Sequence, residues 1–170
     1  MMNPARTQKG FTLVETLVAI TVLIIAIVGP LYAVHRSLVA SYTARDTLVA
    51  TALAQEGVEY VRYIRDGNYL ADNTSDWLDR LALCRLGTGC AIDPHATTLA
   101  AQIQAFATTS AVLRLDASYR YRLSAGTTPP RFVRKIPVTS VSSTEAQVTV
   151  QVFWSTFSIP YNVTVTERLY

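Results

Sequence analysis

The stretch Lys9-Gly10-Phe11-Thr12-Leu13-Val14-Glu15, with the apolar run that follows it to Val34, determines how the rest of this chain is organised. Between Phe11 and Val34, Glu15 is the only side chain that is charged at neutral pH. A helix of this length, rising about 1.5 Å per residue, extends roughly 36 Å and crosses a hydrocarbon core of about 30 Å. The sequence therefore predicts that the chain meets a membrane.

The flanks of the run indicate what kind of membrane segment it is. Basic residues, Arg6 and Lys9, precede it, but the run is too long for an ordinary secretory signal and has no clear small-residue cleavage site after it. A plain signal anchor fits the length and leaves Glu15 unexplained. A carboxylate costs about 2.5–3.5 kcal/mol at the centre of the membrane, and less near the end, so Glu15 requires a partner.

The same residues carry a resemblance to a known family. Lys9 to Glu15, followed by Thr16-Leu17-Val18-Ala19-Ile20, resembles the type IV prepilin signature of type IV pilins, minor pilins and type II secretion pseudopilins. In that family a membrane prepilin peptidase cuts after the glycine and methylates the new amino terminus. The resemblance implies a leader of residues 1–10, cleavage between Gly10 and Phe11, and N-methylation of Phe11.

The spacing of Phe11 and Glu15 is compatible with that chemistry. Residues four apart lie on one face of a helix, about one turn from each other. A methylated amine keeps its charge and can pair with its own Glu15 or with that of a neighbouring subunit; the resemblance implies the neighbour, which makes Glu15 an assembly residue. The alternative is an exposed interfacial glutamate on a signal anchor.

Composition limits the functional classes. The chain has 15 Lys and Arg against 12 Asp and Glu, and removing Arg6 and Lys9 with the leader leaves 13 against 12. The mature charge is nearly balanced, which weakens any argument for bulk attraction to nucleic acid. The two histidines are far apart in sequence, and there is no Gly-x-Ser-x-Gly motif or phosphate loop. We therefore expect no enzyme and no cofactor.

One long helix is predicted from about Leu13 to about Arg65, roughly 80 Å long. Its first half, residues 11–34, is expected in the membrane, and its second half, residues 35–66, is amphipathic. Gly29-Pro30 predicts a kink, either a simple one or the softened segment that pilins show near this position. The expected stripe, apolar with two polar interruptions, recurs every three or four residues: Leu31, Val34, Leu38, Tyr42, Arg45, Val49, Ala52 or Leu53, Glu56, Tyr60 and Ile64.

Residues 67–110 are interpreted as a connecting loop that contains the only cysteines, Cys84 and Cys90. Two glycines between them allow a tight loop, and an extracytoplasmic compartment permits disulfides. A structural disulfide is favoured over free thiols, and over a metal site because too few other ligands are near. The carboxylate and amide side chains in and just before this loop lack the strict order of a helix-loop-helix calcium site, so we expect solvated loop side chains and no metal: Asp66, Asp72, Asn73, Asp76 and Asp79.

From Val112 onward the apolar period changes to two, which predicts strands in residues 111–170. Four segments alternate in this way: 112–123, 132–136, 146–154 and 161–165. We expect them to form an antiparallel sheet of about four strands covered on one face by the amphipathic half of the helix. The fold class is therefore α+β: a long amino-terminal helix packed on a carboxyl-terminal antiparallel sheet, a pilin-like roll.

A basic stretch raises the possibility of DNA binding, which some pilins perform during uptake. Arg and Lys side chains between Arg114 and Lys135 alternate with Tyr119 and Tyr121, although a solvated sheet face has the same composition. Asn73-Thr74-Ser75 and Asn162-Val163-Thr164 match the glycosylation sequon, a tripeptide that often arises by chance.

The favoured function is a structural subunit of a type IV pilus or related filament. The resemblance implies a prepilin in the inner membrane, single-pass with an extracytoplasmic carboxyl-terminal domain, that enters an extracellular filament after cleavage. Its partners would be other pilin subunits, the prepilin peptidase, the inner-membrane assembly platform and membrane lipid.

The alternatives are a type II secretion-type pseudopilin and a bitopic membrane protein with an extracytoplasmic binding head. Glu15 argues against the tip subunit that lacks it. Major pseudopilins carry a calcium site near the carboxyl end, where this chain offers only Glu167. We therefore favour a minor pilin.

Overall fold

The structure is a computed structural model that describes residues 10–71, 76–123, 126 and 131–170. The expected leader, apart from Gly10, and the first sequon lie outside these residues. The chain divides into two compact units, Met1–Tyr42 and Thr43–Tyr170. We call the described part of the first unit the amino-terminal segment and the second unit the head.

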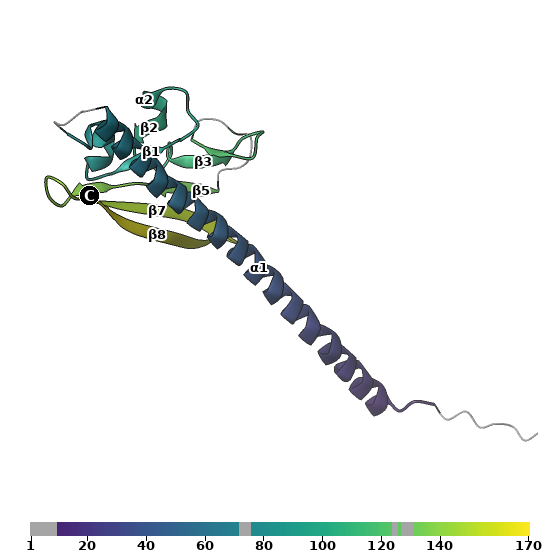
Figure 1. Cartoon of the computed structure of the whole chain (residues 1–170). Coiled ribbons are helices and arrows are strands. Elements are labelled where there is room, and N and C mark those ends of the chain that lie inside the picture. The colour runs from purple at the N-terminus through teal and green to yellow at the C-terminus, as the bar shows by residue number, and fades with distance from the viewer. Residues whose placement is uncertain (1–9, 72–75, 124–125, 127–130) are drawn as a thin grey trace, which may run out of the picture. The chain divides into compact units, whose positions relative to one another are not determined.

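Helix α1 spans Leu13–Leu70 (Figure 1). Pro30 lies inside this helix. The predicted beginning is confirmed, and the helix continues past the expected end at Arg65. Asp66-Gly67-Asn68, a sequence typical of helix ends, lies inside the helix, where Asn68 is buried and its side-chain amide donates to the Trp77 carbonyl (3.0 Å). The last turn closes with the Ala71 N–H donating to the Gly67 carbonyl (3.1 Å).

Six strands form the main antiparallel sheet of the head: β3 (Val112–Leu115), β4 (Tyr121–Arg122), β5 (Phe132–Lys135), β6 (Val138–Ser140), β7 (Ala146–Thr156) and β8 (Ile159–Leu169). Strand β7 pairs with β5 and β6 along one side and with β8 along its whole length on the other. The order continues from β5 to β3 and β4 (Figure 1). The predicted fold class, a long helix on an antiparallel sheet, is confirmed.

The expected number of strands is corrected from about four to six. One predicted segment, residues 112–123, is broken: the Asp116 carboxylate accepts from the N–H groups of Ser118 (2.8 Å) and Arg120 (2.9 Å), and Tyr119 has φ 60°, so a turn separates β3 from β4. The other additional strand, β6, lies outside the predicted segments: Ile136 leaves β7 and exchanges hydrogen bonds with Cys90, Pro137 has no N–H for the ladder, and the chain pairs with β7 again at Val138.

The expected connecting loop contains short elements of its own: η1 (Asp79–Arg85), β1 (Cys90–Ile92), α2 (Leu99–Gln102) and β2 (Ile103–Ala105). Strands β1 and β2 pair antiparallel as a second, two-stranded sheet. Thr98 caps α2, its hydroxyl accepting from the Ala101 N–H (3.3 Å). All three residues of β1 are buried, so this segment belongs to the core of the head.

The core lies between the head portion of α1 and the main sheet. The buried helix face is displaced from the expected stripe, because small residues allow the sheet to approach. A Cβ added to Gly57 would lie 3.1 Å from both Ile136 Cδ1 and Val150 Cγ1. The buried positions of the helix are Asp46, Ala50, Leu53, Ala54, Gly57, Val58, Val61, Ile64 and Asn68.

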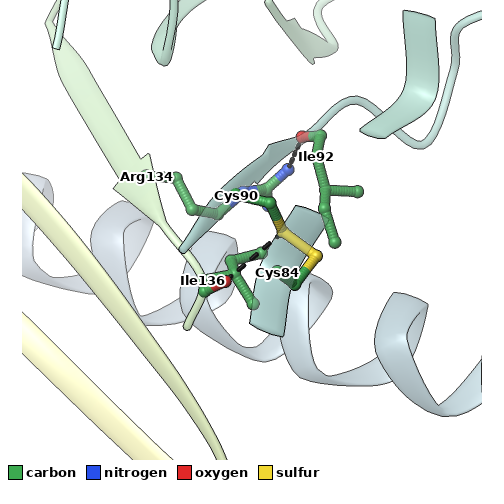
Figure 2. Close-up of a disulfide and its surroundings, with 5 residues drawn as sticks. All are labelled: Cys84, Cys90, Ile92, Arg134 and Ile136. Carbon is green, nitrogen blue, oxygen red and sulfur yellow. Dashed lines mark hydrogen bonds between the residues drawn. A yellow bond between two sulfur atoms is a disulfide. The ribbon is translucent and has the colours of Figure 1, made fainter. Parts of the chain in front are cut away.

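Arg134 on β5 joins three parts of this core although it is fully buried. Its Nη1 donates to the Leu53 carbonyl (2.8 Å) and to Glu56 Oε2 (2.6 Å), both on α1. Its Nη2 donates to the Ile92 carbonyl on β1 (2.7 Å), as Figure 2 shows. The guanidinium therefore cross-links the helix, the main sheet and the small sheet.

Candidate assembly site at the amino terminus

The amino-terminal segment begins with a capped helix. Thr12 precedes the first helical residue, and its hydroxyl accepts from the Glu15 N–H (3.3 Å) while its carbonyl accepts from the Thr16 N–H (3.2 Å). A threonine at this position satisfies an N–H that the helix itself leaves without a partner. Our reading of the sequence missed this role of Thr12, although the Thr-x-x-Glu spacing signals it.

Glu15 lies in the first turn of α1 and is exposed. A carboxylate there is favoured by the positive end of the helix dipole. Phe11, one turn earlier in sequence, is 78% exposed, and a Cβ added to Gly10 would meet nothing within 4 Å. The two predicted processing residues and the predicted assembly residue are therefore all accessible at the beginning of one helix.

The apolar residues after Glu15 have no covering within the described protein. Every residue from Phe11 to Leu38 is exposed, and α1 is long and apolar enough to cross a membrane. Two of its hydroxyls are already bonded to the helix backbone: Thr16 Oγ1 donates to the Leu13 carbonyl (2.8 Å) and Thr21 Oγ1 to the Val18 carbonyl (2.8 Å). Such internal bonds suit a segment surrounded by lipid or by other apolar helices.

The predicted kink at Gly29 and Pro30 stays a prediction. The helix is continuous through both residues, and a Cβ at Gly29 would meet nothing within 4 Å. Proline removes one backbone hydrogen bond from the helix, so this turn is the weakest point of the apolar run.

A family model described as the prokaryotic N-terminal methylation motif matches residues 5–29. The match supports assignment to the type IV pilin and pseudopilin family. The motif supports a type IV pilin-like or pseudopilin precursor. In this family the motif implies a structural protein that a prepilin peptidase processes and that assembles with other pilin subunits. With the apolar helix, it indicates anchorage in the inner membrane before filament assembly. No curated protein and no solved structure is significantly similar to the chain.

The favoured pairing of Cys84 with Cys90 is confirmed: the pilin-like head contains this disulfide, which joins η1 to β1 (Figure 2). Both cysteines are fully buried. Gly89 just before the second cysteine has φ 75°, and a Cβ there would lie 2.9 Å from the Pro137 backbone N. Only glycine fits this position without strain.

The basic stretch of the head is largely neutralised by its own carboxylates. Arg120 lies 3.3 Å from Asp116 and Arg122 lies 3.5 Å from Asp93. Two further arginines are also paired, Arg131 with Asp46 and Arg134 with Glu56. Sequence reasoning missed these pairs because the partners of the last three are about 30 to 85 residues away in the chain. The pairing weakens the hypothesis of DNA binding.

Further charged residues of the head have structural roles. Glu59 and Arg62 are three residues apart and meet on the helix surface (2.6 Å). Arg62 also pairs with Glu167, the one acidic residue near the carboxyl end. His95 Nε2 lies 4.0 Å from Glu56 Oε1, at the margin of the buried Arg134 cross-link.

Proposed function

We propose that this chain is a minor pilin, a structural subunit of a type IV pilus or related filament. It is inserted in the inner membrane as a prepilin with the head outside the cytoplasm, is cleaved between Gly10 and Phe11, and is methylated on the Phe11 amine. The observation that carries the proposal is the motif from Gly10 to Glu15 at the beginning of an apolar helix whose side chains are exposed.

Assembly is proposed to depend on a charge pair between subunits. The methylated Phe11 amine keeps its positive charge, and the Glu15 carboxylate of a neighbouring subunit neutralises it away from bulk water. Removing one member of such a pair leaves an uncompensated charge in a low-dielectric setting, which is far more costly than removing both. The pair therefore sets the register in which apolar helices assemble.

The first test is the mass of the mature protein from cells with an active prepilin peptidase. We expect an amino terminus at Phe11 that carries one methyl group, and Gly10→Val should block cleavage. A mature protein that still begins at Met1 or Met2 would exclude this function and favour a bitopic membrane protein.

The second test compares Glu15→Leu with Val14→Leu in sheared filaments. Glu15→Leu should be cleaved normally and yet be lost from filaments by at least tenfold, because the Phe11 amine has no partner. The neighbouring Val14→Leu change alters size alone and should assemble normally. Equal incorporation of the two variants would contradict an assembly role for Glu15. Subunit abundance in the same filaments distinguishes a minor from a major subunit.

A further inference from the structure

The main sheet of the head ends very differently on its two sides. On one side it ends on short strands, β4 with 2 residues and β6 with 3 residues. On the other it ends on β8, which has 11 residues, keeps continuous register with β7, and has β7 as its strand partner among the described residues (Figure 1). Long, regular edge strands can pair with a further strand, and proteins usually shorten, bend or charge them.

The backbone of β8 offers a regular set of hydrogen-bonding groups at this edge. The turn that precedes it, Phe157-Ser158, has φ values of 51° and 65°, which is the two-residue turn whose flanking residues exchange both hydrogen bonds. Pairs then alternate along the ladder, so every second residue directs its N–H and C=O away from β7. These residues are Asn162, Thr164, Thr166 and Arg168, together with Pro160, whose missing N–H costs no bond to β7.

The side chains of β8 also favour an added strand. Tyr161, Val163 and Val165 pack against the core on one face but stay half-exposed, whereas the opposite face is polar and exposed. From Ile159 to Thr166 the strand has no charged side chain. The charges that follow are already used, Glu167 by Arg62 and Arg168 by Glu145 (2.8 Å).

We propose that β8 is a strand-addition edge whose occupant is β8 of a second copy of this chain, antiparallel and centred on Thr164. Full overlap of the two strands in this register places Val163 opposite Val165 and Asn162 opposite Thr166 of the other copy. Like charges do not meet, whereas a parallel in-register pair would align Glu167 with Glu167 and Arg168 with Arg168. The contact is self-complementary, as a two-fold interface requires.

This interface stands on the head alone and does not depend on pilus assembly, so it is tested on the full chain in detergent micelles. Thr164→Cys should form a disulfide-linked dimer under mild oxidation, since the chain's two native cysteines are already joined. The matched control is Gln151→Cys, the neighbour of Thr164 on β7. It should remain monomeric, because it lies one strand further from the edge and outside the reach of about 7 Å between bridged Cα atoms.

The register has its own test. Asn162→Cys and Thr166→Cys should each remain monomeric alone, because residues four apart along a strand are about 13 Å apart. A mixture of the two variants should cross-link. A monomeric Thr164→Cys, or a mixture that does not cross-link, overturns the proposal. Capture of a different protein by Thr164→Cys in cell membranes, with no dimer, also overturns it, since the occupant is then not a second copy.

Charged substitutions of Thr164, at the centre of the proposed interface, give an independent check, and sedimentation measures the amount of dimer. Thr164→Lys and Thr164→Glu should each weaken dimerisation at least tenfold, because like charges would face each other across the two-fold axis. An equimolar mixture should restore it as a heterodimer. Unchanged thermal unfolding of each variant shows that the pairing of β7 with β8 is intact. Dimerisation of both single variants at the original strength would refute the interface.

Discussion

At the scale of single residues, the head is organised by a buried arginine. Arg134 is fully buried, whereas its partner Glu56 has 36% of its side chain exposed. This asymmetry decides the energetics, because a buried guanidinium without a counter-charge is costly, and a partly exposed carboxylate can be solvated by water. The two members of the ion pair are therefore not equivalent.

We predict that Glu56→Ala destabilises the head more than Arg134→Met does. The first change leaves the buried charge and should lower the free energy of unfolding by about 3–5 kcal/mol. The second removes the charge, leaves the Leu53 and Ile92 carbonyls without that donor, and should cost about 1–3 kcal/mol. Urea unfolding followed by tryptophan fluorescence measures both, with the double variant expected near Arg134→Met. The opposite order would show that Arg134 does not need its partner.

The turn between β3 and β4 is held by one carboxylate. The backbone N–H of Arg120 holds the pKa of Asp116 below its usual value of 3.8, and the N–H of Ser118 and the Arg120 guanidinium act in the same direction. Because the folded pKa is the lower one, this carboxylate stabilises the head above the unfolded pKa. The contribution is lost as the pH falls through the folded value.

We therefore predict that Asp116→Asn is less stable than the original chain at pH 7 and that the gap narrows at pH 3. Asparagine keeps an oxygen acceptor for the two N–H groups but loses the charge that makes these bonds strong. Urea midpoints of the two proteins at both pH values measure the gap. A gap that does not change with pH would contradict this role for Asp116.

At the scale of elements, α1 packs against the sheet through small residues. Ala50, Ala54 and Gly57 are buried at the contact, and Gly57 faces Ile136 and Val150 at close range. The helix stripe predicted from the spacing of large apolar residues is therefore displaced by about one position from the face that is buried. A close approach of helix and sheet fixes which helix face is buried, and side-chain size limits that approach.

Gly57→Val should overpack this contact and lower the free energy of unfolding by about 1–3 kcal/mol. The matched control is Gly67→Val in the same helix, where an added Cβ would meet only the Arg80 Nη1 atom at 3.9 Å. Both changes remove a helical glycine, so their backbone effects are similar, and the difference between their urea midpoints isolates the packing term. Equal midpoints would argue against a tight helix–sheet contact.

At the scale of the whole molecule, the two units have different requirements. The amino-terminal segment exposes every apolar side chain from Phe11 to Leu38, whereas the first buried residue of the head along the chain is Asp46. The buried core of the described protein thus lies within Thr43–Tyr170. The first unit needs a membrane or neighbouring helices to cover its apolar side chains. The second unit contains its own core.

We predict that residues 43–170, produced in an oxidising compartment, are soluble and unfold cooperatively on heating. A chain that begins at Val58 should fail to fold, because it lacks Asp46, Ala50, Leu53, Ala54 and Gly57. Circular dichroism during thermal unfolding compares the two. Aggregation of the longer chain would show that the head depends on residues before Thr43.

Features built from neighbouring residues could be predicted from the sequence, because local patterns specify them. The methylation motif, the apolar run, the beginning of α1 and the pairing of Glu59 with Arg62 all involve residues within a few turns of one helix. The disulfide joins cysteines only 6 positions apart, with glycines between them. The roles of Gly10, Phe11 and Glu15 at the candidate assembly site were predicted from the sequence alone and stay predictions.

Only the tertiary structure decided how the head is held together. The strand breaks at Asp116 and Pro137, the burial of Arg134 and the neutralisation of the basic stretch depend on contacts between distant parts of the chain. The periodicity of the sequence does not predict these contacts, because an arginine in a strand fits the same alternating pattern whether it is buried or exposed. The sequence by itself determined a long amino-terminal helix that begins with a methylation motif. Which helix face the sheet covers, and which strand is left at the sheet edge, follow from side-chain sizes and pairings that only packing reveals.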